Sequence, residues 1–196
     1  MKSPTRTTQS INNVRVSLFF SVGVLILGFF SRKILIECLG AEVLGINTTA
    51  ANLLGFLNLA ELGISAAISY TLYTPLFQKD YDAINEIVAV QGWLYRRIAY
   101  IVLAGGVVLM CFFPLIFSKM ELPLWYAYSS FGVLLVAAML GYIINYQQIV
   151  LSADQQEYKI NYNVQGFRVL KLLLQIVGIG YFQQGYIYWL IVELLM

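Results

Sequence analysis

Long apolar stretches follow one another along the chain, and short polar segments separate them. Each is long enough to form a helix, and a helix needs about 20 apolar residues to cross a bilayer. We predict membrane spans over about residues 12–39, 43–77, 98–118, 124–151 and 160–182. A sixth span begins at Tyr186 and is cut short at Met196. The pattern predicts an all-α integral membrane protein, and we expect the chain to be a fragment of a longer protein.

The second apolar run, residues 43–78, contains one charged residue, Glu61. As a helix it would be roughly 54 Å long, too long for one upright span. Two spans would need a hairpin around Glu61 without loop residues, and that hairpin would leave backbone groups unpaired in hydrocarbon. We therefore predict one long helix that is tilted or broken, with Gly55 and Gly63 as bend points.

Residues 79–97 form a polar connector that begins with a helix start at Asp80. Its apolar positions Ile84, Ile87 and Val88 share one helical face, which predicts a short amphipathic helix on the membrane surface. The following run, residues 98–118, carries no charge before Lys119 and is the clearest span of the chain. Membrane insertion favours such a run.

Composition agrees with a lipid environment. Hydrophobic residues make up 60% of the 196 residues and charged residues only 11%, whereas soluble domains are about 25% charged. The net charge of +2 is too small to indicate a nucleic-acid partner. Basic residues favour a cytoplasmic N-terminus, since nine then lie on the cytoplasmic side and three on the other.

The sequence offers no catalytic or metal-binding pattern. It contains no histidine, and its two cysteines, Cys38 and Cys111, lie far apart in apolar runs. We interpret them as small apolar residues rather than a disulfide or a metal pair. Walker, nucleophile-elbow and Cys-x-x-Cys motifs are absent from the sequence. We therefore expect neither an enzyme, a cofactor nor a metal.

Polar residues at helical spacing lie within the second and fifth predicted spans. Asn58, Glu61 and Ser65 are three and four residues apart, so they share one helical face. Asn, Gln and Ser can simply join helices in lipid by hydrogen bonds. We favour the alternative, in which the polar stripes together line a water-filled cavity. The candidate substrate-path residues are Arg32, Asn58, Glu61, Ser65, Asn145, Asn161, Gln165, Arg168 and Lys171.

Charged residues inside the bilayer cost about 2.5–3.5 kcal/mol each, so each needs an explanation. Glu61 either lies on a substrate or ion path or caps a helix break. Arg32 either turns inward to meet an anionic substrate or extends, together with Lys33, to the outer interface. Arg168 and Lys171 either anchor the cytoplasmic end of their helix or form a cationic lining at the cavity mouth.

Three blocks of the sequence resemble one family. They are residues 30–45, residues 53–76 with the segment Leu-Ala-Glu-Leu-Gly-Ile, and residues 146–158 with Tyr146 and Ala-Asp-Gln at its end. They resemble bacterial polysaccharide repeat-unit flippases. These are the O-antigen and capsule transporters of the multidrug/oligosaccharidyl-lipid/polysaccharide exporter superfamily. Many relatives carry basic residues after the tyrosine of the third block, where this chain has Gln147 and Gln148.

The resemblance implies a MATE-like fold with two lobes of six helices related by an axis along the membrane normal. This chain would be the N-terminal lobe, with its last helix truncated and the C-terminal lobe as its partner. The implied function is to move polyprenyl-diphosphate-linked oligosaccharides across the bacterial cytoplasmic membrane by alternating access. Such a cargo needs amides and hydroxyls for its sugars and cations for its diphosphate.

Three other functions stay open. A drug/cation antiporter of the same superfamily would want an acidic residue well inside the first helix, whereas Glu37 lies at the outer end. A membrane-embedded glycan polymerase or ligase would need a large catalytic loop outside the membrane. A non-transporting structural subunit would use the polar stripes only to join helices.

Overall fold

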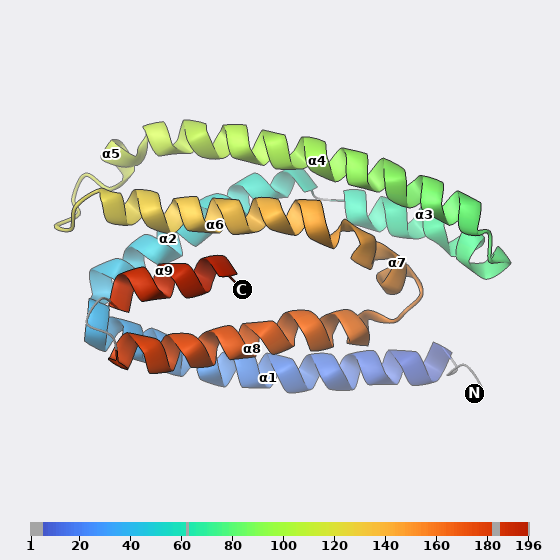
Figure 1. The fold of residues 1–196 in the computed structure, drawn as a ribbon, viewed down its shortest axis with the longest axis horizontal. Coiled ribbons are helices and arrows are strands. Elements are labelled where there is room, and N and C mark those ends of the chain that lie inside the picture. Colours follow the sequence, from blue (N-terminus) through green and yellow to red (C-terminus); the bar gives the residue numbers. More distant parts are fainter. Residues whose placement is uncertain (1–5, 62, 182–184, 196) are drawn as a thin grey trace.

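The computed structural model describes residues 6–61, 63–181 and 185–195, apart from the side chains of residues 6–10, 60 and 145. Every regular element in this part of the chain is helical, and the long helices lie roughly along one axis (Figure 1). The elements are α1 (Arg6–Leu39), α2 (Ala41–Asn58), η1 (Leu59–Glu61), α3 (Ile64–Gln78), α4 (Tyr81–Cys111), α5 (Phe113–Ile116), α6 (Trp125–Ile144), η2 (Asn145–Gln147), α7 (Gln148–Ala153), α8 (Glu157–Tyr181) and α9 (Gly185–Leu195).

The helices form two groups that α2 and α9 connect. In one group α1 packs along α8, and in the other α6 packs against α2 and α4. The short helix α9 contacts both α8 and α6. At one end of the molecule α3, the first half of α4 and α7 pack around a small core of Leu72, Ile84, Ile149 and Ala153.

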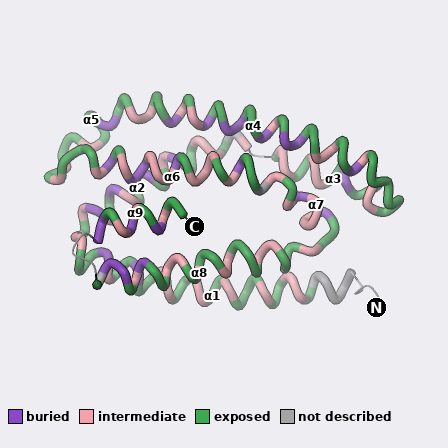
Figure 2. The backbone as a smooth tube through the Cα atoms, viewed as in Figure 1, coloured by how far each residue is buried: buried purple, intermediate pink, exposed green. Residues whose placement is uncertain are grey.

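Three described helices are long and apolar enough to cross a membrane: Ile11–Leu39, Tyr81–Cys111 and Trp125–Ile144. Many of their apolar residues are exposed. Figure 2 shows exposed positions, in green, along all the long helices. In α1, for example, Phe19 is 77% and Leu25 is 73% exposed. Since water would penalise this surface, the protein is a multi-pass membrane protein whose helices face lipid. The predicted all-α class and multi-pass character are confirmed, whereas the spans predicted over residues 43–77 and 160–182 are not among these three helices.

The second apolar run is a broken helix, as predicted. Helix α2 ends at Asn58, and α3 continues from Ile64 in the same general direction (Figure 1). The break lies at Gly63, whose φ of 86° is a left-handed conformation that glycine adopts without a steric penalty. Gly55, the other predicted bend point, lies inside an uninterrupted α2.

The prediction of a separate amphipathic surface helix within residues 79–97 is wrong. Helix α4 runs without interruption from Tyr81 to Cys111 and joins that segment to the following span. The predicted start is correct, because the Asp80 carboxylate caps the helix by accepting a bond from the Ala83 N–H at 3.1 Å. The apolar face that suggested a membrane surface packs instead on α3 and α7, where Ile84 is buried.

The prediction of one continuous span over residues 124–151 is also wrong. The chain passes from α6 through the 3₁₀ turn η2 into α7. This turn carries Tyr146, whose ring lies against Gly92 of α4 so closely that a Cβ at residue 92 would be 2.9 Å from it. A glycine at this contact lets the ring approach the α4 backbone, so the turn is fixed by packing rather than by a local breaker residue.

Candidate functional site

The structure divides the predicted substrate-path residues between separate cavities. The first, here called the break cavity, has a volume of about 460 Å³ and lies beside the break between α2 and α3; Asn58, Glu61 and Ser65 line it. The second, here called the α1–α8 cavity, measures about 800 Å³ and lies among α1, α2, α8 and α9. No described residue lines both. The described residues of the two polar stripes therefore line different cavities, and the prediction of one shared path stays a prediction.

Two hydroxyl groups donate hydrogen bonds to Glu61, the acidic residue of the break cavity. Tyr95 of α4 donates its hydroxyl to Glu61 Oε1 at 2.5 Å, and Ser65 of α3 donates to the same oxygen at 3.0 Å. One turn before Glu61, Asn58 Oδ1 accepts a bond from the Tyr142 hydroxyl at 3.1 Å. These contacts tie α3, α4 and α6 to the end of α2. Within the described residues no cation pairs with Glu61.

Two residues of this cavity were not expected in a site. Tyr95 and Gln91 of α4 were not among the predicted candidates, and both are buried. Gln91 is only 1% exposed, and its Oε1 has no hydrogen-bond partner among the described residues. Their spacing of four residues puts them on one face of α4. That spacing is the signal that could have joined them to the site.

Most of the charged residues that were predicted as candidates line the α1–α8 cavity. Arg32 of α1 and Arg168 and Lys171 of α8 line it, and Glu193 of α9 is its one acidic residue among the described lining. The lining thus carries an excess of two positive charges. Gln165 lines it too, together with the amides Asn47, Asn52 and Gln175.

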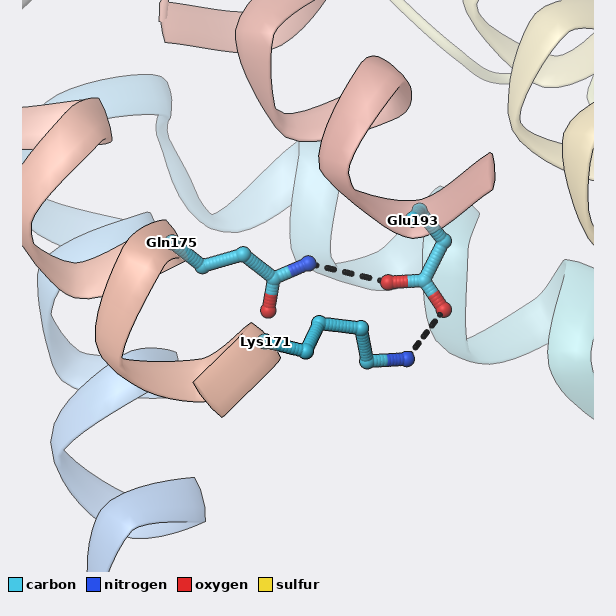
Figure 3. A network of polar contacts seen from close by, with 3 residues as sticks. All are labelled: Lys171, Gln175 and Glu193. Carbon is cyan, nitrogen blue, oxygen red and sulfur yellow. Dashed lines mark hydrogen bonds and ion pairs between the residues drawn. The ribbon is translucent and has the colours of Figure 1, made fainter. Parts of the chain in front are cut away.

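Lys171 is a paired cation. Its Nζ lies 2.9 Å from Glu193 Oε1, and Gln175 Nε2 donates to Glu193 Oε2 at 2.9 Å, so one carboxylate accepts from two donors on α8 (Figure 3). The side chains of Lys171 and Glu193 are 21% and 15% exposed. Sequence patterns missed Glu193, although a lone acid in an apolar run is itself a signal of function.

Arg32 and Arg168 differ from Lys171. Both side chains line the α1–α8 cavity and are exposed, and neither forms an ion pair with another described residue. Lys33, the neighbour of Arg32, pairs instead with Glu37 at 3.7 Å. The cavity also contains unused acceptors, because the Oδ1 of Asn47 and the Oε1 of Gln165 are buried without a donor in the described chain. An anion and hydrogen-bond donors would complement such a lining.

The two remaining candidates lie elsewhere. Asn161 lines a smaller cavity of about 360 Å³ between the first halves of α1 and α8, with Asn13 and Glu157. The backbone of Asn145 belongs to η2, but its side chain lies outside the described residues. Neither residue is therefore placed in the break cavity or the α1–α8 cavity.

The described residues contain no group of three or more His, Cys, Asp or Glu side chains that could hold a metal ion. Comparisons with protein families, curated proteins and solved structures find no match to the chain. An account of function therefore depends on the chemistry of the two cavities.

Proposed function

We propose that the chain is the N-terminal lobe of a MATE-like transporter that moves polyprenyl-diphosphate-linked oligosaccharide units across the bacterial cytoplasmic membrane by alternating access. In this proposal a C-terminal lobe of the same protein completes the central path. The units would then serve surface polysaccharide biosynthesis. The observation that carries the proposal is the α1–α8 cavity, which combines surplus positive charge with amides inside a lipid-facing bundle.

The cavity lining is complementary to each part of this cargo. A diphosphate forms charge-assisted hydrogen bonds with guanidinium groups, and Arg32 and Arg168 supply two. Sugar hydroxyls are donors that suit the unused oxygens of Asn47 and Gln165. The volume of about 800 Å³ is that of an ordinary ligand site and large enough for a few sugar rings. The polyprenyl tail can stay in lipid against the apolar outer faces of the helices.

A drug/cation antiporter is the runner-up, and the charge of the cavity argues against it. Organic cations need acidic or aromatic surroundings. The described lining does contain the aromatic residues Phe29 and Trp189. Its one carboxylate, that of Glu193, is however paired with Lys171, and the surplus charge of the lining is positive. A non-transporting structural subunit predicts a different outcome, namely that Arg32→Ala lowers assembly rather than transport.

Deletion of the gene in its bacterium tests the proposal. We expect surface polysaccharide to be lost and lipid-linked units to accumulate on the cytoplasmic leaflet, where a membrane-impermeant glycosidase applied to inside-out vesicles cleaves them. The full-length gene supplied on a plasmid should restore export. Normal export in the deletion strain, without accumulation, would contradict the proposed function.

A further inference from the structure

The carboxylate of Glu193 contacts donors of the kind that proteins use to bind anions. It accepts one charge-assisted bond from Lys171 and one amide bond from Gln175, each at 2.9 Å (Figure 3). Both donors lie on α8, four residues apart and therefore on one face. Arg168 lies one turn before Lys171 and lines the same cavity. One face of α8 thus presents a row of donors, and the acceptor comes from a different helix.

The position of α9 does not depend on this ion pair. The Tyr186 hydroxyl at the start of α9 donates to the Tyr126 carbonyl at 2.8 Å and lies 2.7 Å from Ser129 Oγ. Trp189, one turn further on, is 3% exposed and packs in a core with Tyr186 and Leu35. These contacts anchor α9 to α6 and α1. A buried ion pair is in general weak evidence for stability, because desolvation offsets its attraction.

We propose that Lys171, Gln175 and Arg168 form a binding site for a phosphate or diphosphate group, and that Glu193 is a built-in competitor which occupies this site until such a ligand displaces it. The ligand class follows from the donors, which fit a compact oxyanion. Displacement exchanges one anion for another on Lys171, so it leaves no new cation unpaired. The inference rests on the proposed function only for the source of the phosphate, a lipid headgroup.

The test uses the full-length protein in lipid nanodiscs, with the probes inorganic diphosphate and farnesyl diphosphate. Glu193→Gln removes the competing charge and keeps an amide of similar shape. We expect this variant to bind diphosphate about tenfold more tightly than the wild type at constant ionic strength, as measured by calorimetry. Glu86→Gln is the matched control: it makes the same change in charge at an exposed residue of α4 outside the described lining of the cavity.

A second variant keeps the test decisive if Glu193→Gln leaves Lys171 unpaired and fails to fold. The double variant Lys171→Gln/Glu193→Gln contains neither charge of the pair, and neutral replacement of a buried pair is usually tolerated. We expect it to bind diphosphate about fivefold more weakly than the wild type, because a charged donor is lost. Loss of the competitor alone would tighten binding, so a double variant that binds diphosphate more tightly than the wild type would overturn Lys171 as a donor to the ligand.

The outcomes separate this inference from the proposed function. Tighter binding of inorganic diphosphate by Glu193→Gln supports a site that recognises phosphate alone. A gain seen only with farnesyl diphosphate supports a site for a lipid headgroup. Unchanged or weaker binding of both probes by a folded Glu193→Gln variant overturns the competitor. If that variant binds more tightly while the gene-deletion strain exports polysaccharide normally, the anion site stands and the proposed function fails.

Discussion

The break cavity and the α1–α8 cavity both contain polar residues inside a membrane bundle, but they satisfy these residues differently. In the break cavity Glu61 Oε1 accepts hydrogen bonds from Tyr95 and Ser65, so the chain itself supplies partners for this carboxylate. In the α1–α8 cavity Arg32 and Arg168 have no acidic partner among the described residues. The α1–α8 cavity thus leaves charged groups without an ion-pair partner in the described chain, whereas the break cavity leaves the neutral amide oxygen of Gln91 without a donor.

The difference has a structural origin. The break at Gly63 brings the ends of two helices beside α4, whose tyrosine hydroxyl reaches the acid, and the result is a local polar joint. Helices α1 and α8 are unbroken and lie side by side (Figure 1). The polar side chains between α1 and α8 therefore need hydrogen-bond partners from α2, from α9 or from a ligand. The break cavity thus joins helices through hydrogen bonds, whereas the α1–α8 cavity is the one that our proposal assigns to cargo.

The largest expected effect comes from removing the unpaired cations. Arg32→Gln together with Arg168→Gln should weaken binding of diphosphate by about 100-fold, because two charge-assisted hydrogen bonds are lost. Calorimetry on the full-length protein in nanodiscs measures this affinity. Lys159→Gln is the control, since Lys159 is an exposed cation of α8 outside the described lining of the cavity. Equal losses in both proteins would mean that overall charge, and not this cavity, attracts the anion.

A smaller effect is expected from a change that disturbs the α1–α8 cavity through its α9 wall. A Cβ at Gly178 would lie 1.8 Å from the ring of Tyr188, whose hydroxyl donates to the Leu174 carbonyl at 3.2 Å. Gly178→Ala must move that ring, and overpacking of this kind costs about 1–3 kcal/mol. We expect a lower thermal midpoint than for Gly166→Ala on the same helix, where a Cβ meets nothing within 4 Å. Equal midpoints would show that α8 and α9 are packed loosely.

The smallest effect on transport is expected in the break cavity. Glu61→Gln keeps an acceptor for Tyr95 and Ser65, so transport should stay within about threefold of the wild type. Glu61→Leu removes that acceptor from partly buried hydroxyls and should cost about 1–3 kcal/mol of stability. Transport assays and thermal melts of the two variants check this pair of expectations. If transport is lost in Glu61→Gln while the melting temperature is normal, the carboxylate charge itself takes part in transport.

Local sequence patterns were enough to predict helices of membrane-spanning length and to name Gly63, with Gly55, as a bend point. An apolar run of this length and a glycine at a left-handed position are properties of neighbouring residues. Local patterns were not enough to fix the length of α4. Amphipathicity shows that a helix has an apolar face, but the partner of that face, here α3 and α7, depends on how distant segments pack.

The composition of the candidate site was harder to predict for the same reason. Arg32, Gln165 and Arg168 could be found from their cost in lipid and their spacing. The pairing of Lys171 with Glu193 could not, because it depends on the register between α8 and α9. The division into two cavities likewise depends on contacts such as that of Tyr142 with Asn58, which are 84 residues apart in the chain.

One measurement tests the central claim most directly, since Arg32 and Lys33 are adjacent on α1 and carry the same charge. Arg32 lines the α1–α8 cavity, whereas Lys33 pairs with Glu37 and is outside its described lining. The full-length variants Arg32→Gln and Lys33→Gln are reconstituted in liposomes, and the rate at which lipid-linked oligosaccharide reaches the opposite leaflet is measured. We predict that Arg32→Gln lowers this rate at least about tenfold and that Lys33→Gln leaves it unchanged. Equal rates for the two variants would contradict the claim that the α1–α8 cavity is the path of the cargo.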